Sequence, residues 1–255
     1  MRPGLVSVTF RKLSAVEVIR LCVANRLEAI EWGGDIHVPH GDEAAAVRVG
    51  QATREAGLSV SAYGSYYRLG VSGGDGPDFS TVLKTACALG APAIRVWAGN
   101  CGSGDADAAL RSRVADDVLR CADLAAAAGI MIAFEYHSNT LTDTVDSTCA
   151  LLEATAHPMI KTLWQPPVGL EASECLAGLR RVMPWLLHVH AFHWWPDSGS
   201  RHPFRHGLDR WSAYLAEIQS AGLDPDVLLE FVRGDDPSAL TDDAATLREL
   251  VSRET

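Results

Sequence analysis

The chain has 255 residues, of which 47% are hydrophobic and 21% charged, and its formal net charge is −10. A chain of this length can bury a large core, and α/β barrels often reach about 250 residues as a single domain. The acidic balance disfavours a nucleic-acid partner, because proteins that bind phosphate backbones need positive charge to displace counterions.

Neither a membrane span nor a secretion signal is predicted. No apolar run reaches the roughly 18 residues that a spanning helix needs. The first residues, MRPGLVSVTF, pass straight into strand-like alternation, without the apolar core or cleavage site of a signal peptide. The six cysteines are scattered with no CxxC pair, and we expect buried free thiols. These features predict a cytoplasmic protein without a membrane partner.

A short apolar run followed by a helix-period segment recurs along the whole chain. The expected strands are residues 4–10, 27–32, 58–63, 92–97, 130–136, 159–164, 186–192 and 226–231. The expected helices are residues 14–25, 42–56, 79–89, 106–128, 143–156, 170–183, 208–221 and 237–253. Ser14 with Glu17 three residues later is typical of a capping box. Glycine precedes several strands, as expected of the left-handed position that ends a helix, namely Gly57, Gly90, Gly129 and Gly222.

Eight strand–helix pairs predict a parallel sheet with helical crossovers. The absence of a ninth pair favours closure into a single-domain (β/α)8 TIM barrel over residues 1–255, with an open doubly wound sheet as the runner-up. No GxGxxG follows the first strand and no GxxxxGK[ST] occurs, so a nucleotide-phosphate cradle is not supported. Segments 33–40, 70–78, 99–107 and 196–207 follow strand ends, on the face where barrels keep their active sites.

Four polar residues fall at the ends of four consecutive expected strands. Glu135 ends IMIAFE, Gln165 follows MIKTLW, His190 lies within LHVHAF and Glu230 ends DVLLE. Barrel strands are covered on both faces, so polar side chains at their last positions are expected to face the mouth. Two carboxylates, an amide oxygen and an imidazole suit Mn²⁺, Mg²⁺, Co²⁺ or Zn²⁺. An isolated strand-end Glu is more often a salt-bridge partner, but four aligned donors predict a divalent metal site.

Four segments, IEWGGDIHVP, FEYH, HVHAFHW and LLEFVRGD, resemble in order and spacing the xylose isomerase-like TIM-barrel proteins. This family includes the sugar phosphate isomerase/epimerase group and endonuclease IV-like and inosose dehydratase-like enzymes. The resemblance implies one divalent metal, with Mn²⁺ favoured, held by Glu135, Gln165, His190 and Glu230. The family more often has Asp at the Gln165 position, and an amide oxygen brings less charge. Family members commonly form homodimers or homotetramers.

The resemblance also implies a reaction. Glu135 and Glu230 are expected on opposite sides of the metal, where they act as an acid/base pair that moves a proton next to a carbonyl through an enediolate. This predicts an isomerase or epimerase of a sugar or sugar derivative. The alternative is a metal-dependent lyase that dehydrates a cyclic polyol or keto-sugar. A non-catalytic small-molecule-binding barrel and an abasic-site endonuclease are further alternatives, and the acidic charge disfavours the last.

Further polar and aromatic residues near the strand ends are candidate contacts to a small sugar-like substrate. They are His37, Tyr63, Arg95, Trp97, His137, Trp164, His188, His193, Arg201 and Arg233. Structural alternatives exist: loop capping for His37, stacking within the barrel for Arg95, and a satisfied core histidine for His188. Arginines form bidentate hydrogen bonds with carboxylate or phosphate. The expected substrate is therefore either a phosphorylated or a free sugar. The aromatic residues favour a carbohydrate-like or cyclic substrate.

Overall fold

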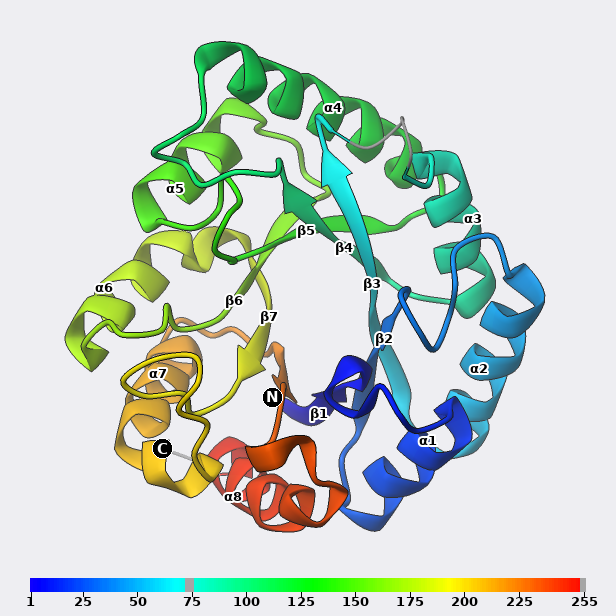
Figure 1. Cartoon of the computed structure of the whole chain (residues 1–255), viewed down its shortest axis with the longest axis vertical. Helices are drawn as coiled ribbons and strands as arrows, with labels where there is room; N and C mark the ends of the chain where they lie inside the picture. Colours follow the sequence, from blue (N-terminus) through cyan, green and yellow to red (C-terminus); the bar gives the residue numbers. More distant parts are fainter. Residues whose placement is uncertain (72–75, 253–255) are drawn as a thin grey trace.

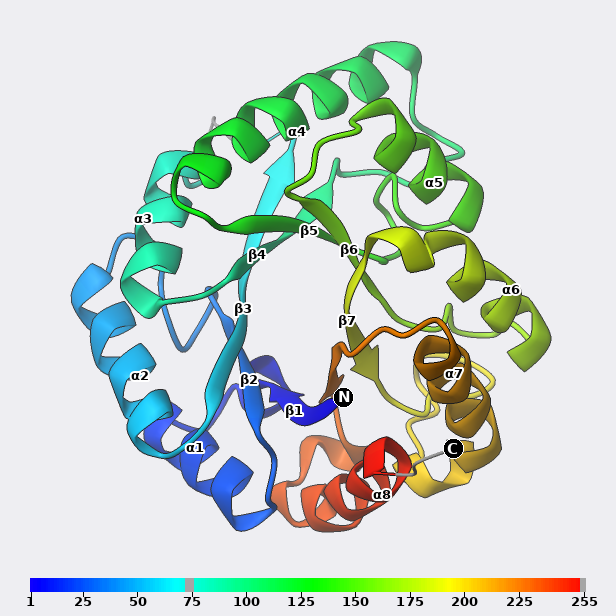
Figure 2. The same cartoon turned by 180° about the vertical axis from the view of Figure 1, so that it is seen from behind.

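The computed structural model describes residues 1–71 and 76–252. Eight strands in this part of the chain close into one barrel in sequence order, and the helices surround it (Figures 1 and 2). The strands are β1 (Arg2–Val6), β2 (Ala29–Gly33), β3 (Ser59–Leu69), β4 (Ala93–Ala98), β5 (Met131–Glu135), β6 (Ile160–Trp164), β7 (Leu186–Ala191) and β8 (Asp226–Leu229). The predicted single-domain (β/α)8 barrel is confirmed, and the open sheet is excluded.

Each strand is followed by its own helix. These are α1 (Ala15–Ala24), α2 (Glu43–Glu55), α3 (Phe79–Leu89), α4 (Ala108–Ala127), α5 (Val145–Ala154), α6 (Ala172–Val182), α7 (Leu208–Ser220) and α8 (Leu240–Ser252). In the described residues no helix combines the length and apolar character that crossing a membrane requires.

The barrel closes where β1 lies between β8 and β2. Gly4 aligns with Leu228 on one side and with Ala29 on the other. A Cβ at position 4 would lie 2.5 Å from both the Ala29 carbonyl oxygen and the Leu228 side chain. Glycine therefore lets the two neighbours approach the first strand closely.

The local helix signals are confirmed. The Ser14 side chain accepts from the Glu17 backbone, and the Glu17 carboxylate accepts in return from Ser14, which forms the predicted capping box. The glycines expected before strands adopt left-handed backbone, with φ of 78°, 76°, 69° and 72° at Gly57, Gly90, Gly129 and Gly222. These positions show that local chemistry decided where several helices begin and end.

Two expected strands differ from the observed ones by more than two residues at one end. β1 ends at Val6, and residues Ser7–Phe10 form a short 3-10 helix, η1, that is buried. β3 continues to Leu69 because its second half pairs with β4 after an irregularity between Gly64 and Tyr67. Two expected segments, the loop 70–78 and the last helix to residue 253, extend beyond the described residues at 72–75 and 253.

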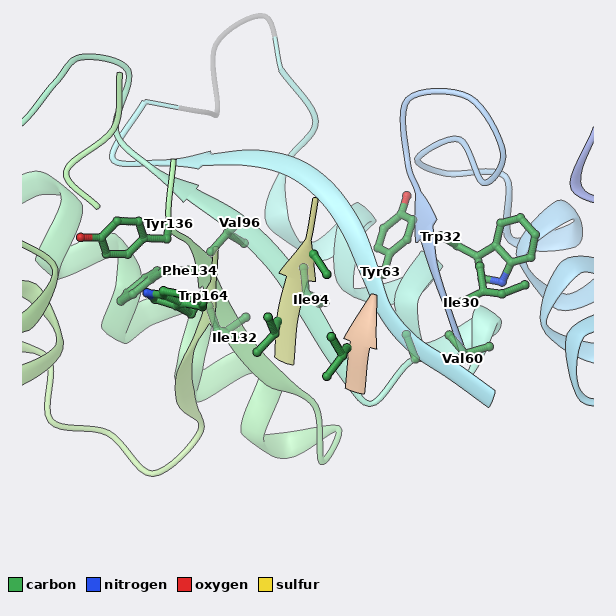
Figure 3. Close-up of a cluster of buried hydrophobic side chains, with 14 of the residues drawn as sticks. Ile30, Trp32, Val60, Tyr63, Ile94, Val96, Ile132, Phe134, Tyr136 and Trp164 are labelled. Carbon is green, nitrogen blue, oxygen red and sulfur yellow. The ribbon is translucent and has the colours of Figure 1, made fainter. Parts of the chain in front are cut away.

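Side chains of each strand alternate between the barrel interior and the layer beneath the helices. Figure 3 shows part of that outer layer, where Trp32, Tyr63 and Trp164 lie among aliphatic side chains. The Trp32 indole donates to Thr53 Oγ1 of α2 at 3.1 Å, which fixes its outward direction. Glu31, next to Trp32, consequently faces the interior. The barrel interior is thus partly charged.

Candidate metal centre and active site

Three of the four predicted ligands converge at the ends of β5, β7 and β8. Glu135, His190 and Glu230 are buried, and each offers a ligand atom within 4.8 Å of the others. Strand register explains the convergence. Glu135 aligns with Leu163 on β6, and His190 aligns with Leu228 on β8. Alternation then turns the residues two positions further on, Gln165 and Glu230, to the same side.

Two polar atoms of the predicted ligand set are buried without a hydrogen-bond partner: Gln165 Oε1 and His190 Nδ1. His190 Nδ1 lies 3.5 Å from Glu230 Oε2. A buried polar atom left unpaired costs about 1–3 kcal/mol, so such atoms indicate a binding partner that the protein alone does not provide. Both atoms are suitable ligands for a divalent cation, and the three clustered residues fit a metal site.

The second nitrogen of His190 is hydrogen-bonded to a residue from another strand. His190 Nε2 lies 2.9 Å from Glu31 Oε2 of β2. Glu31 is fully buried, and its other oxygen accepts from Arg95 Nε of β4 at 2.6 Å. Metal-bound histidines commonly donate their outer N–H to a carboxylate in this way.

Arg95 also reaches the first glutamate of the cluster. Its Nη1 and the Trp97 indole N–H both donate to Glu135 Oε2, so that Oε1 receives neither donor. A Cβ at Gly64 would lie 2.5 Å from Arg95 Nη2 and 2.8 Å from Glu31 Oε1. Glycine at the β3 irregularity therefore makes room for the Arg95–Glu31 pair.

The charges of this network influence one another strongly. Burial opposes ionisation of Glu31 and Glu135, but Arg95 and His190 outweigh it and hold the pKa of both carboxyl groups below the ordinary value. Burial also opposes a charged His190, yet Glu31 and Glu230 raise its pKa to about 10. With His190 neutral, three carboxylates and one guanidinium leave two net negative charges. A divalent cation matches this charge, which supports the fit.

A cavity of about 500 Å³ opens beside Gln165. Its wall includes His137, Asp143, Phe192 and Trp194, and the last two rings stack at 4.3 Å. Such a volume is within the range of small-molecule sites. A second cavity of about 470 Å³ lies on the β1 and β8 side and is lined by Phe231, the residue after Glu230.

Comparison with known proteins identifies the family. A family model described as xylose isomerase-like TIM barrel matches residues 19–250. The chain belongs to this family. One xylose isomerase-like relative is a 3-dehydroshikimate dehydratase of Bacillus anthracis, which is 24% identical over 207 residues, covering 74% of this chain and 71% of the relative.

Solved xylose isomerase-like structures share the whole architecture. A probable 3-DHS dehydratase involved in petrobactin synthesis from Bacillus anthracis superposes with a TM-score of 0.79 at 20% identity, covering 100% of both chains. D-psicose 3-epimerase, solved in the presence of D-fructose, gives 0.69 at 15% identity and covers 98% of this chain and 96% of its own. The fold is therefore shared by proteins named for a dehydration and for an epimerisation.

Three of the ten predicted substrate contacts lie at the cluster of Glu135, His190 and Glu230 or at the first cavity of this xylose isomerase-like barrel. Arg95 and Trp97 contact Glu135. His137 lines the first cavity and stacks on Trp97 at 5.0 Å. Its Nδ1 donates to the Ser138 carbonyl at 2.6 Å. Arg95 is buried between two glutamates, so its guanidinium serves the protein's own carboxylates.

Four other predicted contacts are engaged by the protein's own residues. Tyr63 and Trp164 are buried in the outer layer, where the Tyr63 hydroxyl donates to the Val38 carbonyl and Trp164 meets Trp211 of α7 edge-on. His37 is held by Ser7 and the Leu13 carbonyl. His188 lies at the opposite end of the interior. Strand alternation places Tyr63, Trp164 and His188, whereas His37 lies in the loop after β2. Sequence position alone does not show which partners these side chains take.

The remaining predicted contacts lie on the loops above β7 and β8. His193 is half-buried near His202, with ring centres 6.0 Å apart. Arg201 pairs with Asp235 at 2.8 Å and lies over the rings of Trp194 and Phe231. Arg233 is exposed on the short helix η4 (Arg233–Asp235).

Sequence reasoning did not assign a role to several residues that the structure brings to the site. Glu31 is one of them, and a Glu inside an apolar strand was a usable signal. Asp143 lines the first cavity, and its Oδ1 is buried without a hydrogen bond. Tyr66 has left-handed backbone (φ 55°), and its ring lies 4.8 Å from the Arg95 guanidinium carbon.

Proposed function

We propose that this chain is a divalent-metal-dependent lyase that removes water from a small cyclic hydroxyketone, with a compound of the 3-dehydroshikimate type as the first candidate. The observation that carries the proposal is the buried cluster of Glu135, His190 and Glu230 with the unpaired oxygen of Gln165. The dehydratase of Bacillus anthracis, similar at 24% identity, supports the choice of reaction.

Glu135, Gln165, His190 and Glu230 would hold the cation, with Mn²⁺ favoured and Mg²⁺, Co²⁺ or Zn²⁺ as alternatives. A bound divalent cation supplies Lewis-acid polarisation of a substrate carbonyl and its neighbouring hydroxyl. This set of oxygen and nitrogen donors suits these ions better than metals that prefer thiolate ligands.

The two glutamates are held differently, which favours a lyase with one base. Glu135 is anchored by Arg95 and Trp97 and has a lowered pKa, so it stays ionised and is a weak proton acceptor. Among the ion pairs of the described residues Glu230 has only the 3.5 Å contact to His190, and the ring of its neighbour Phe231 lies 5.7 Å from that of Trp194, which lines the first cavity. We therefore assign proton removal from the carbon next to the carbonyl to Glu230.

His137 is the candidate acid for the leaving hydroxyl. In the imidazolium form of His137, Nδ1–H donates to the Ser138 carbonyl and Nε2–H carries the proton that can pass to the leaving hydroxyl within the first cavity. The carbon–hydrogen bond breaks toward Glu230, a carbon–carbon double bond forms, and the carbon–oxygen bond breaks with protonation from His137. The net change is loss of one water molecule.

An isomerase or epimerase of a sugar derivative is the second candidate. It is favoured by the presence of two carboxylates at one cluster, with Glu135 and Glu230 as acid/base pair, and by the fold shared with D-psicose 3-epimerase. A reversible transfer of the same proton would then replace loss of the hydroxyl.

The experiment incubates Mn²⁺-loaded protein with 3-dehydroshikimate and, in parallel, with a panel of ketoses in deuterated water. Dehydration produces an unsaturated product that absorbs in the ultraviolet, whereas isomerisation introduces carbon-bound deuterium. We expect the ultraviolet signal, and expect it to depend on added metal. Deuterium in a ketose without ultraviolet product would establish the second candidate, and metal-independent binding without turnover would exclude both.

A further inference from the structure

We propose that Glu31, a β2 residue outside the candidate ligand set, is a positioning residue for the metal centre, acting through His190 and Arg95. The inference rests on the proposed metal-dependent function and adds a residue to it. Glu31 is fully buried in the barrel interior, and each of its two oxygens contacts a different partner.

The first partner decides which nitrogen His190 presents to a cation. A carboxylate oxygen accepts hydrogen bonds, so Glu31 Oε2 holds the proton of His190 on Nε2 at 2.9 Å. Neutral imidazole carries one proton, and its lone pair is then on Nδ1. Nδ1 is the buried nitrogen without a hydrogen bond that lies 3.5 Å from Glu230. Glu31 thereby selects the tautomer whose lone pair faces the other ligands.

The second partner couples Glu31 to Glu135. Arg95 Nε donates to Glu31, while Nη1 donates to Glu135 Oε2, so one planar guanidinium spans both carboxylates. Because Arg95 is buried and donates to both carboxylates from one planar group, this bridge fixes the direction of the Glu135 carboxylate. Glu31 therefore orients ligands on two different strands.

A second buried histidine, His188, shows how a purely structural histidine of this barrel differs from His190. His188 also lies near a buried carboxylate, Asp226, but its Nε2 contacts the Ser61 carbonyl at 3.2 Å and its Nδ1 accepts from the Asp226 backbone at 3.3 Å. Both nitrogens of His188 thus have partners within the protein. His190 keeps one nitrogen open, which a purely structural contact would not require.

The test measures Mn²⁺ affinity of the full chain by calorimetric titration for wild type, Glu31→Gln and Asp226→Asn. The control removes one buried carboxylate charge beside a barrel histidine without touching His190. We expect Glu31→Gln to weaken Mn²⁺ binding about 10- to 100-fold, and Asp226→Asn to bind as wild type. Glu31→Asp, which keeps the charge, should recover part of the loss and provides a folded comparison if the Gln variant is unstable.

A second measurement uses the wild type alone. Nitrogen-15 NMR of the Zn²⁺-loaded protein, with the His190 signal assigned by its absence in His190→Gln, should show the ring proton on Nε2. A proton on Nδ1, or equal Mn²⁺ affinity of wild type and Glu31→Gln, overturns the positioning role while leaving the metal site intact. Failure of wild type to bind any divalent cation overturns the proposed function itself, and the two failures are therefore distinguishable.

Discussion

The two ends of the barrel interior each contain a histidine, a carboxylate and an arginine, but the two groups serve different purposes. At the N-terminal end of the strands, His188 lies beside Asp226. The Arg2 guanidinium donates to the two carboxylate oxygens of Asp226 at 2.7 and 3.0 Å. At the mouth, His190 lies beside Glu31, which Arg95 holds at 2.6 Å. The two histidines are two positions apart along β7, so both face inward.

The difference between the ends lies in what remains unpaired. Both nitrogens of His188 have partners, whereas His190 Nδ1 has none and shares its surroundings with two further carboxylates. Burial also lowers the pKa of His188, while Glu31 and Glu230 outweigh burial and raise that of His190. A buried histidine next to a carboxylate is therefore structural when both ring nitrogens have hydrogen-bond partners. It is a candidate metal ligand when one nitrogen has none.

Glu230→Gln should produce the largest effect at the mouth. The amide keeps the size of the side chain but cannot accept the substrate proton, so turnover should fall about 10²- to 10⁴-fold. Steady-state rates of the Mn²⁺-loaded variant on the active substrate measure this loss. Turnover equal to wild type would contradict the assignment of Glu230 as base.

Asp226→Asn should produce a loss of stability without a loss of function. The variant weakens the hydrogen bonds from the Arg2 guanidinium, which is half exposed, so we expect a decrease of about 1–3 kcal/mol in the free energy of unfolding. Urea denaturation gives this value, and turnover serves as the control. A large decrease in turnover with unchanged stability would show that the N-terminal end of the strands also takes part in the reaction.

Metal affinity should depend on pH through His190. Its pKa is raised to about 10 in the metal-free protein, so the ring is protonated near neutral pH and must lose a proton to bind a cation. Affinity should therefore weaken as pH falls, by about tenfold per pH unit, with release of about one proton per ion. Calorimetry in two buffers of different ionisation enthalpy measures the released proton. Affinity that does not change with pH would place the metal on other ligands.

Gln165→Glu should have the smallest effect and should strengthen binding. The substitution preserves the length of the side chain and replaces a neutral amide oxygen by a carboxylate, which is the better ligand for a hard cation. We expect Mn²⁺ affinity to increase several-fold. Competition with a coloured chelator measures this affinity. Gln165→Leu is the matched variant without a ligand atom, and it should bind more weakly than wild type. An unchanged affinity in both variants would remove Gln165 from the ligand set.

Much of the architecture followed from local patterns in the sequence. The repeat of apolar runs and helix-period segments predicted the order of the elements, and Ser14 and Gly90 marked where individual helices begin and end. The strand-end positions of Glu135, His190 and Glu230 predicted a cluster that the closed barrel brings together. These features depend on short-range periodicity and on the rule that adjacent parallel strands end on one face.

Tertiary structure decided the rest, because it depends on which side of a strand each residue faces and on what lies opposite. Trp164 and Tyr63 were candidates from their strand-end positions, but alternation turns them under the helices. Glu31 and Arg95 are 64 residues apart along the chain, and only closure of the barrel joins them to each other and to His190. Residue types and their order define the barrel and its candidate ligands, whereas the network that orients those ligands exists only once the strands are side by side.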